Sequence, residues 1–268
     1  MLVVIRGAGD LASGVALRLH RAGIGLVMTD VEHPTAIRRT VCFSEAIKKG
    51  ETVLEGVRAV RIFRPEEAKA VLDRGEIAVI ADPDGTCIKD LAPDAVVDAI
   101  LAKKNLGTTI DMAPVVIGVG PGFTAGVDCH AVVESMRGHY LGRVIHEGSA
   151  IPNTGVPGNI GGFTLERVLR APAEGIFHPR RDIGDEVKAG EVAGEVEHEG
   201  EMVPMICTID GILRGILEDG VPVFKGMKSG DIDPRCKKEH CYCSSDKALS
   251  IGGGVLEAVL ELTGALRV

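Results

Sequence analysis

The sequence lacks tryptophan and is poor in the other aromatic residues. Its 268 residues include no Trp, two Tyr and six Phe, although hydrophobic residues as a whole make up 45%. The core must therefore be built from Val, Ile, Leu and Ala. Charged residues make up 25%, and this balance excludes a disordered chain.

The sequence also lacks a long apolar run and an excess of basic residues. No apolar stretch approaches the ~20 residues that cross a bilayer. The first apolar segment, residues 2–5, ends at Arg6 and a glycine loop, unlike a signal peptide. The net charge of −8 argues against nucleic acid or an anionic membrane as the main partner. We expect a cytoplasmic protein whose seven cysteines are reduced.

The first half of the chain has an α/β pattern. Strands are predicted at residues 2–5, 24–28, 77–81, 108–110 and 115–119, and helices at 15–22, 65–73 and 94–104. Strands that alternate with helices are typical of a parallel sheet. We therefore expect residues 1–150 to form a Rossmann-like domain, a parallel sheet with helices on both faces.

The second half has a different composition. Residues 151–164 are rich in Gly and Pro and predict a linker, and residues 165–235 contain short strands separated by glycines. The pattern Gly-x-x-Val-x-x-Gly occurs twice, which resembles an all-β biotinyl/lipoyl barrel-sandwich. That family carries its cofactor on a Lys of an exposed hairpin, but Glu197–Met202 contains no Lys. We expect no biotin or lipoate here, and a docking or scaffold role. Residues 236–268 are expected to form a Cys-rich turn and a C-terminal helix.

A glycine turn after the first strand is the first candidate site. It matches the dinucleotide fingerprint G-x-G-x-x-G/A, in which glycines allow a tight turn and close approach of a pyrophosphate. An acidic residue at the end of the second strand would bind a ribose hydroxyl. The candidate cofactor-binding residues are Gly7, Gly9, Asp10, Ala12 and Asp30.

Two further loops follow predicted strands. Asp82 and Asp84 could hold a metal or polarise a ligand, but we favour the simpler interpretation of an Asp-rich turn. The other loop has four glycines in nine residues, which suits an anion or a pterin-like ring. Its candidate residues are Gly118, Gly120, Gly122 and Gly126.

Thiols and an imidazole gather near the C-terminus. These are the ligands that Zn²⁺, Cu⁺ and iron–sulfur clusters prefer. Alternatively, neighbouring Lys237 and Lys238 would favour thiolates that handle sulfur or selenium, or the cysteines have no role. The candidate metal ligands are Cys236, His240, Cys241 and Cys243.

Several motifs together resemble the YqeB family of accessory proteins, found with selenium-dependent molybdenum hydroxylases. They lie at residues 7–14, 119–123, 134–139, 152–155, 230–235, 245–248 and 252–258. The resemblance implies a cytoplasmic role in maturation of such a hydroxylase, which would be the client. The first half is also similar to XdhC-type molybdenum-cofactor insertion chaperones.

Three functional hypotheses follow. The first is a maturation factor that binds a nucleotide or a molybdopterin-type cofactor, with NAD(P) and molybdopterin cytosine dinucleotide as candidate ligands. The second is an NAD(P)-dependent oxidoreductase that uses Asp30 for the ribose and His130 as a base. The third is a non-catalytic scaffold. The sequence leaves open whether the protein is an enzyme, and also its oligomeric state.

Overall fold

The computed structural model describes residues 1–265 and divides the chain into two units. Each unit is assembled from separate segments. Unit 1 comprises Met1–Pro34, Cys42–Thr154 and Ser244–Val268, and unit 2 comprises Thr35–Val41 and Gly155–Cys243. The chain therefore leaves unit 1 twice and returns to it twice.

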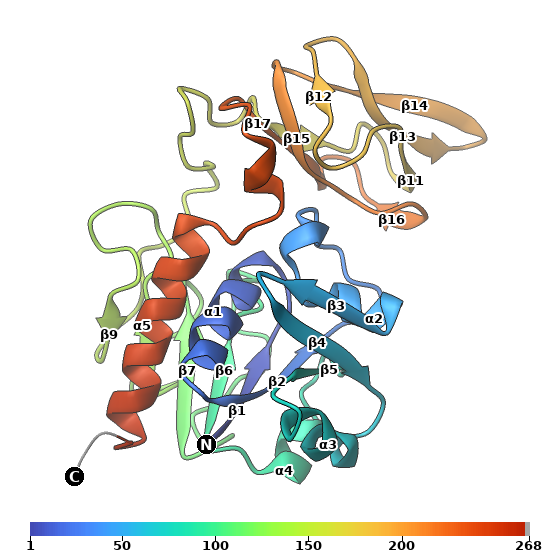
Figure 1. Ribbon diagram of the computed structural model, residues 1–268. Helices are drawn as coiled ribbons and strands as arrows, with labels where there is room; N and C mark the ends of the chain where they lie inside the picture. Colours follow the sequence, from blue (N-terminus) through green and yellow to red (C-terminus); the bar gives the residue numbers. More distant parts are fainter. Residues whose placement is uncertain (266–268) are drawn as a thin grey trace. The chain divides into compact units, whose positions relative to one another are not determined.

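Unit 1 is built on a nine-stranded sheet with the order β3-β4-β5-β2-β1-β6-β7-β8-β9 (Figure 1). The strands from β4 to β8 in this order pair in parallel, whereas β3 and β9 are antiparallel to their neighbours. The strands are β1 (Leu2–Arg6), β2 (Gly25–Asp30), β3 (Glu51–Leu54), β4 (Val57–Ile62), β5 (Ile77–Ala81), β6 (Ala95–Asp98), β7 (Val115–Val119), β8 (Ala131–Val133) and β9 (Val144–Ile145).

The expected Rossmann-like parallel sheet with helices on both faces is wrong. Both ends of the sheet are antiparallel, and residues 99–114, which join β6 to β7, contain no helix. The helix expected at 94–104 is strand β6, because its run of buried apolar residues, including Val96 and Val97, lies between β1 and β7. Loop residues such as Phe123 and Cys129 cover part of one sheet face where a helix was expected.

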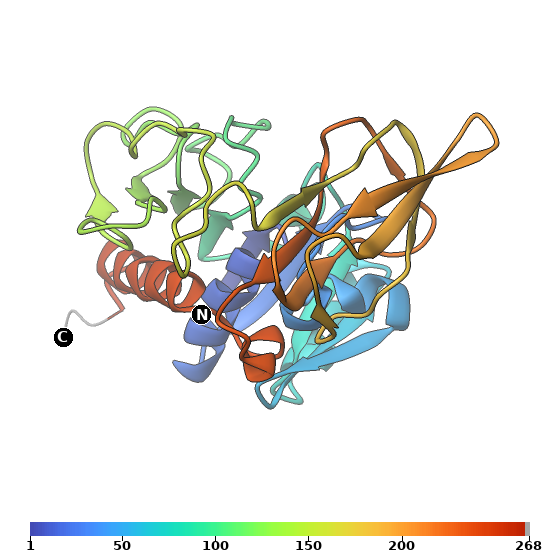
Figure 2. The same cartoon turned by 90° about the horizontal axis from the view of Figure 1, so that it is seen from above.

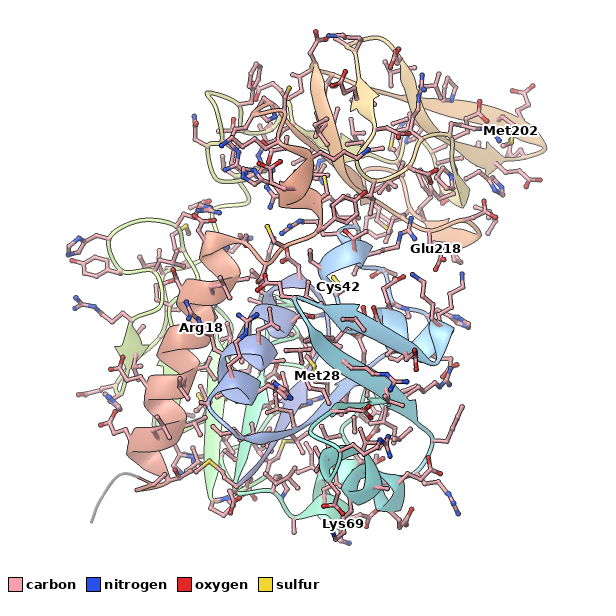
Figure 3. All side chains as sticks on the ribbon, viewed as in Figure 1. Arg18, Met28, Cys42, Lys69, Met202 and Glu218 are labelled. Carbon is pink, nitrogen blue, oxygen red and sulfur yellow. The ribbon has the colours of Figure 1, made fainter. Side chains whose placement is uncertain are left out.

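Within residues 1–265, unit 1 contains five α-helices. They are α1 (Asp10–Arg21), α2 (Glu45–Lys49), α3 (Ala68–Leu72), α4 (Cys87–Leu91) and α5 (Asp246–Leu262), with a short 3-10 helix at Pro65–Glu67. Helix α5 lies along α1 in both ribbon views (Figures 1 and 2). Arg18 of α1 donates from Nε to the carbonyl of Leu249 at 3.3 Å, and its side chain points toward α5 (Figure 3).

Helix α5 runs through Gly252, Gly253 and Gly254. Glycine inside a helix costs about 1 kcal/mol relative to Ala. Close packing explains two of the three glycines. A Cβ on Gly252 would lie 2.7 Å from the carbonyl of Gly14 in α1, and one on Gly254 would overlap the carbonyl of Gly142.

Unit 2 contains two four-stranded antiparallel sheets, with the orders β10-β17-β15-β12 and β14-β13-β11-β16. The strands are β10 (Val168–Arg170), β11 (Gly175–Pro179), β12 (Glu186–Val187), β13 (Val192–His198), β14 (Glu201–Ile206), β15 (Gly211–Ile216), β16 (Val221–Val223) and β17 (Lys228–Asp233). Short 3-10 helices lie at Arg39–Val41 and Lys238–Cys241. Phe177, Val196, Leu213 and Ile232 are fully buried between the strands.

The expected biotinyl/lipoyl-like barrel-sandwich is also wrong. The strands form two separate sheets, and the pairing registers shift at Leu169/Arg170, Val192/Gly194 and Leu213/Gly215. Segment 35–41 belongs to this unit as well, since the amide of Ile216 donates to the carbonyl of Ile37 at 2.8 Å. Sequence repetition alone did not reveal this inserted segment.

Candidate functional site

The glycine turn after β1 is held in place by hydrogen bonds and close contacts within unit 1. Gly7 has φ +97°, and a Cβ there would lie 2.9 Å from the carbonyl oxygen of Ala99. The amide of Ala8 donates to Asp30 Oδ2 at 2.9 Å, and its carbonyl accepts from the amide of Ser44 at 2.9 Å. The missing side chain of Gly7 thus lets the loop after β6 approach.

Asp30 supports the turn. Its Oδ2 accepts from Ala8 and its Oδ1 accepts from the amide of Val31 at 2.8 Å. Burial raises the pKa of this carboxyl, and the two backbone hydrogen bonds oppose the shift. Both oxygens predicted to meet a ribose therefore already hold backbone amides.

Gly9 is the open position of this turn. It precedes α1 at φ −73°, and a Cβ there would meet nothing within 4 Å. Asp10 begins the helix, and Ala12 is buried in it. Gly9 and the first turn of α1 are therefore where a predicted nucleotide or pterin ligand could approach the backbone.

The second glycine loop is largely filled by protein atoms. A Cβ on Gly118 would lie 2.5 Å from the ring of Phe123, and one on Gly120 would lie 2.5 Å from Ser135 Oγ. A Cβ on Gly122 would lie 2.7 Å from the backbone of Lys104. Gly126, at φ +83°, faces open space. Three of the four glycines serve close packing of the chain.

The Asp-rich turn after β5 caps a helix. Asp82 Oδ2 accepts from the amide of Cys87 at 2.7 Å, and Oδ1 accepts from Thr86 Oγ1 at 3.1 Å. Burial acts to raise the pKa of Asp82, but these hydrogen bonds outweigh it and lower the pKa. Asp84 is exposed beside it. The simple turn explanation fits Asp82.

His130 lies away from the glycine turn. It directly precedes β8, so it lies at the amino end of a strand that runs parallel to β7, whereas Gly7 follows the carboxyl end of β1. Its Nδ1 accepts from the amide of Val116 at 2.9 Å. The geometry does not bring this predicted base together with Asp30.

Arg6 is a residue that the sequence analysis did not select. It ends β1 and is 1% exposed. Its Nη1 lies 3.5 Å from Asp98 Oδ2 at the end of β6, and it also donates to Thr108 Oγ1, which donates to the same carboxylate at 2.5 Å. Its Nη2 donates to the carbonyl of Pro83 at 3.2 Å. Its only sequence signal is a charge directly after a buried strand.

The cysteine segment of unit 2 is split by burial. Cys236 is exposed, Cys243 is half-buried and Cys241 is buried. Burial raises the pKa of Cys241, and this effect is larger than the lowering by the nearby cations Arg38 and Arg214. The thiolate that Lys237 and Lys238 were predicted to favour is therefore disfavoured at Cys241.

These residues do not form a metal cluster in the structure. Within residues 1–265, no three His, Cys, Asp or Glu side chains gather as a metal ion would require. The side chain of His240 is instead near Asp233, with Nδ1 3.7 Å from Oδ2. The sequence grouped Cys236, His240, Cys241 and Cys243 by spacing, but in the structure they differ in burial, from the buried Cys241 to the exposed Cys236.

Asp233 organises the backbone before Cys236. Its Oδ1 accepts from the amide of Arg235 at 3.0 Å, and its Oδ2 accepts from Arg235 Nη2 at 2.6 Å. Arg214 Nη1 lies 3.3 Å from the same carboxylate. Burial acts to raise the pKa of Asp233, but these guanidinium groups hold it well below its usual range. Asp233 is therefore a buried anion that fixes the turn.

Comparison with known proteins supports the sequence resemblance. No family model matches the chain. The uncharacterized protein YqeB of Escherichia coli K12 is 54% identical over 262 residues, which is 97% of this chain and 48% of that protein. This chain is a homologue of YqeB. It spans about half the length of that relative, whose name states no activity.

Solved structures give only distant matches. An aspartoacylase family protein of Mesorhizobium loti aligns over 86% of this chain and 84% of its own, with 12% identity and a TM-score of 0.30. A succinylglutamate desuccinylase/aspartoacylase of Rhodobacter sphaeroides aligns over 33% of this chain and 29% of its own, with 23% identity and a TM-score of 0.24. Neither description names a Rossmann or biotinyl/lipoyl protein. TM-scores this low do not establish a shared fold, and we take no activity from these proteins.

No helix within residues 1–265 is long and apolar enough to span a membrane.

Proposed function

We propose that this chain is an accessory protein in the maturation of a selenium-dependent molybdenum hydroxylase, and that Cys236 is its reactive group. The hydroxylase context is what the motifs shared with the YqeB family imply, and the 54% identity to YqeB supports the family resemblance. The observation that carries the role of Cys236 is its geometry: it is the exposed one among the seven cysteines, and it has φ +56°.

The backbone conformation of Cys236 is costly. A non-glycine residue at positive φ costs about 1–2 kcal/mol, and such strain persists only where surrounding contacts impose it. Here the buried Asp233 holds Arg235, and the amide of Cys236 donates to the carbonyl of Asp233 at 3.3 Å. The thiol donates to the carbonyl of Pro234 at 3.5 Å. An exposed thiol is thus presented on a fixed turn.

This arrangement suits contact with a soft element. A thiol binds sulfur, selenium or a soft metal more readily than oxygen ligands do. The side chains of Lys237 and Lys238 are exposed beside Cys236 and would attract an anionic form of such a group. Binding of a nucleotide or a molybdopterin-type ligand stays a separate prediction that depends on Gly9.

The test is production of the client hydroxylase in cells that carry this protein as their source of YqeB function. Cys236→Ser should reduce client activity and client selenium content to below about a tenth of the wild-type level, because a hydroxyl is a poor soft ligand. Purified Cys236→Ser should melt at the wild-type temperature, since the side chain is exposed.

Cys207→Ala is the matched control, because it removes a thiol that is buried in the same unit. Its client activity should stay near the wild-type value. Full client activity with Cys236→Ser would overturn the proposal. Equal loss of client activity in both variants would show that the substitutions act by destabilising unit 2 and not by removing a reactive thiol.

A further inference from the structure

The outward face of one sheet in unit 2 carries apolar side chains. Neighbouring residues on a strand point to opposite faces. Phe177 of β11 and Val196 of β13 are fully buried, so the adjacent Ile176 and Glu197 point outward. Ile176 pairs with Pro222 on β16, and Glu197 pairs with Met202 on β14. One row across four strands therefore reads Pro222, Ile176, Glu197 and Met202.

Apolar side chains on this face are exposed to solvent. Ile176 is 37%, Met202 43%, Ile206 42% and Phe224 65% exposed. Met202 lies near the end of the β13–β14 hairpin (Figure 3). A solvated antiparallel sheet ordinarily has apolar residues inside and polar residues outside. We call Ile176, Met202, Ile206, Pro222 and Phe224 the apolar face.

Acidic residues lie within and beside the apolar face, because Glu197 stands between Ile176 and Met202 in this row. Residues 191–201 contain Glu191, Glu195, Glu197, Glu199 and Glu201 and no Lys or Arg. Arg180 pairs with Glu195, and Arg181 lies 3.5 Å from Glu191. Glu197, Glu199 and Glu201 are exposed. His178, in the next outward position on β11, has Nδ1 2.7 Å from Asp219. The β13–β14 hairpin therefore gives the apolar face a negatively charged surrounding.

The edges of this sheet disfavour extension by another strand. Its edge strands are β14 and β16, and each contains a proline, Pro204 and Pro222. Proline has no amide hydrogen to donate to an added strand and is a common protection of sheet edges. A partner would therefore contact the side chains of the face.

We propose that the apolar face binds a basic segment of another protein, one that carries Lys or Arg between apolar side chains. Exposed apolar patches mark interaction sites, and opposite charge between and beside the apolar side chains selects the partner. A second copy of this chain is disfavoured, since it would bring two acidic hairpins together. This inference goes beyond the proposed function and does not require it.

The binding test uses a fluorescein-labelled peptide of alternating leucine and lysine and the full-length protein. Fluorescence anisotropy should show binding that weakens with added salt. A peptide with glutamate in place of lysine should not bind, and a peptide with serine in place of leucine should bind at least about tenfold more weakly.

Variants locate the binding on the protein. Glu197→Lys/Glu201→Lys should weaken binding of the leucine–lysine peptide by about tenfold or more. Ile176→Ser/Met202→Ser should weaken it by about fivefold or more. Met202→Ser alone, at an exposed edge-strand position, gives a second measurement if the double variant does not fold.

The controls change the same properties in unit 1. Glu66→Lys/Glu147→Lys alters net charge equally, and both residues are exposed. Val53→Ser/Val127→Ser removes exposed apolar side chains, 59% and 67% exposed. Both controls should bind the peptide as the wild type does.

Three results would overturn the proposal. One is absence of peptide binding, and another is equal weakening by the unit 1 controls, which would indicate attraction by net charge alone. The third is a dimer in sedimentation that Ile176→Ser/Met202→Ser dissociates, which would assign the face to a second copy. Since none of these measurements involves the hydroxylase, failure here is distinguishable from failure of the Cys236 experiment.

Discussion

The glycine loops of unit 1 and the cysteine segment of unit 2 looked equally suited to binding in the sequence. In the structure, Gly7, Gly118 and Gly122 leave room for the backbone or side chains of their own unit. Cys236 shows the opposite arrangement, because a residue with a side chain is held at positive φ and exposed. Glycines in unit 1 therefore allow close packing, whereas the positive φ of Cys236 in unit 2 belongs to a turn that exposes a thiol.

The glycine turn after β1 and the turn before Cys236 each follow a residue of a buried ion pair. In unit 1, Arg6 and Asp98 connect the ends of β1 and β6. In unit 2, Asp233 holds Arg214 and Arg235. Breaking a buried pair by removing one partner costs more than removing an exposed pair, because it leaves an uncompensated charge. Substitutions and thiol labelling can separate close packing in unit 1 from exposure of the Cys236 thiol in unit 2.

The largest effect is expected from Arg6→Met. The variant leaves the carboxylate of Asp98 buried without its cation, and we expect it to lower the free energy of unfolding by about 3–5 kcal/mol. Urea denaturation measures this change. Arg58→Met is the control, since Arg58 pairs with Glu51 and Glu76 at the surface and its loss should lower the free energy of unfolding far less than the loss of Arg6. Equal losses would contradict the structural role of Arg6.

Thiol labelling compares the exposed Cys236 of unit 2 with the buried Cys87 and Cys129 of unit 1. Burial raises the pKa of Cys87 to about 12 and that of Cys129 to about 11. Both thiols are therefore almost fully protonated at pH 8, and their side chains are covered. Cys236 should react with N-ethylmaleimide at least about a hundredfold faster than either. Peptide mass spectrometry over time gives the rates. Faster labelling of Cys87 or Cys129 would show that unit 1 opens readily.

Substitutions of glycine test the filled loop against the open position. Gly118→Ala places a methyl group 2.5 Å from the Phe123 ring, and such overpacking should cost about 1–3 kcal/mol. Gly9→Ala meets no neighbour and should cost below about 1 kcal/mol, mainly through the poorer helix cap. Thermal unfolding compares the two variants. A larger loss for Gly9→Ala would reverse our description of the two loops.

The smallest effects are expected from the pH dependence of two carboxyls. The pKa of Asp233 is lowered, so its contribution to stability is complete above about pH 4, the ordinary carboxyl pKa, and is lost as the pH falls. The pKa of Asp30 is raised, so its contribution is complete below about pH 4 and is lost as the pH rises through the raised value.

Urea denaturation across this pH range should show opposite slopes. Relative to wild type, the stability of Asp233→Asn should fall as the pH rises from acid, whereas that of Asp30→Asn should rise. Slopes of the same sign would contradict one of the two pKa directions. Arg58→Met, which alters no buried carboxyl, serves as a control for general electrostatic effects.

The positions of several elements could be predicted from the sequence. Runs of buried Val and Ile predicted the strands observed as β1, β5 and β7, and the apolar segment after the glycine turn predicted most of α1. These predictions succeeded because short apolar runs and glycine turns act over neighbouring residues. The candidate site was predicted only as a set of residue types.

The sequence by itself determined where the chain could turn and which short segments had to be buried. Only the tertiary structure decided that β3 and β9 are antiparallel, that residues 35–41 join unit 2 and that α5 joins unit 1. The tertiary structure also decided that Phe123 fills the space beside Gly118, and that Cys241 is buried while Cys236 is exposed. The physical reason is that strand direction, burial and the filling of a missing side chain depend on contacts between residues far apart in the chain.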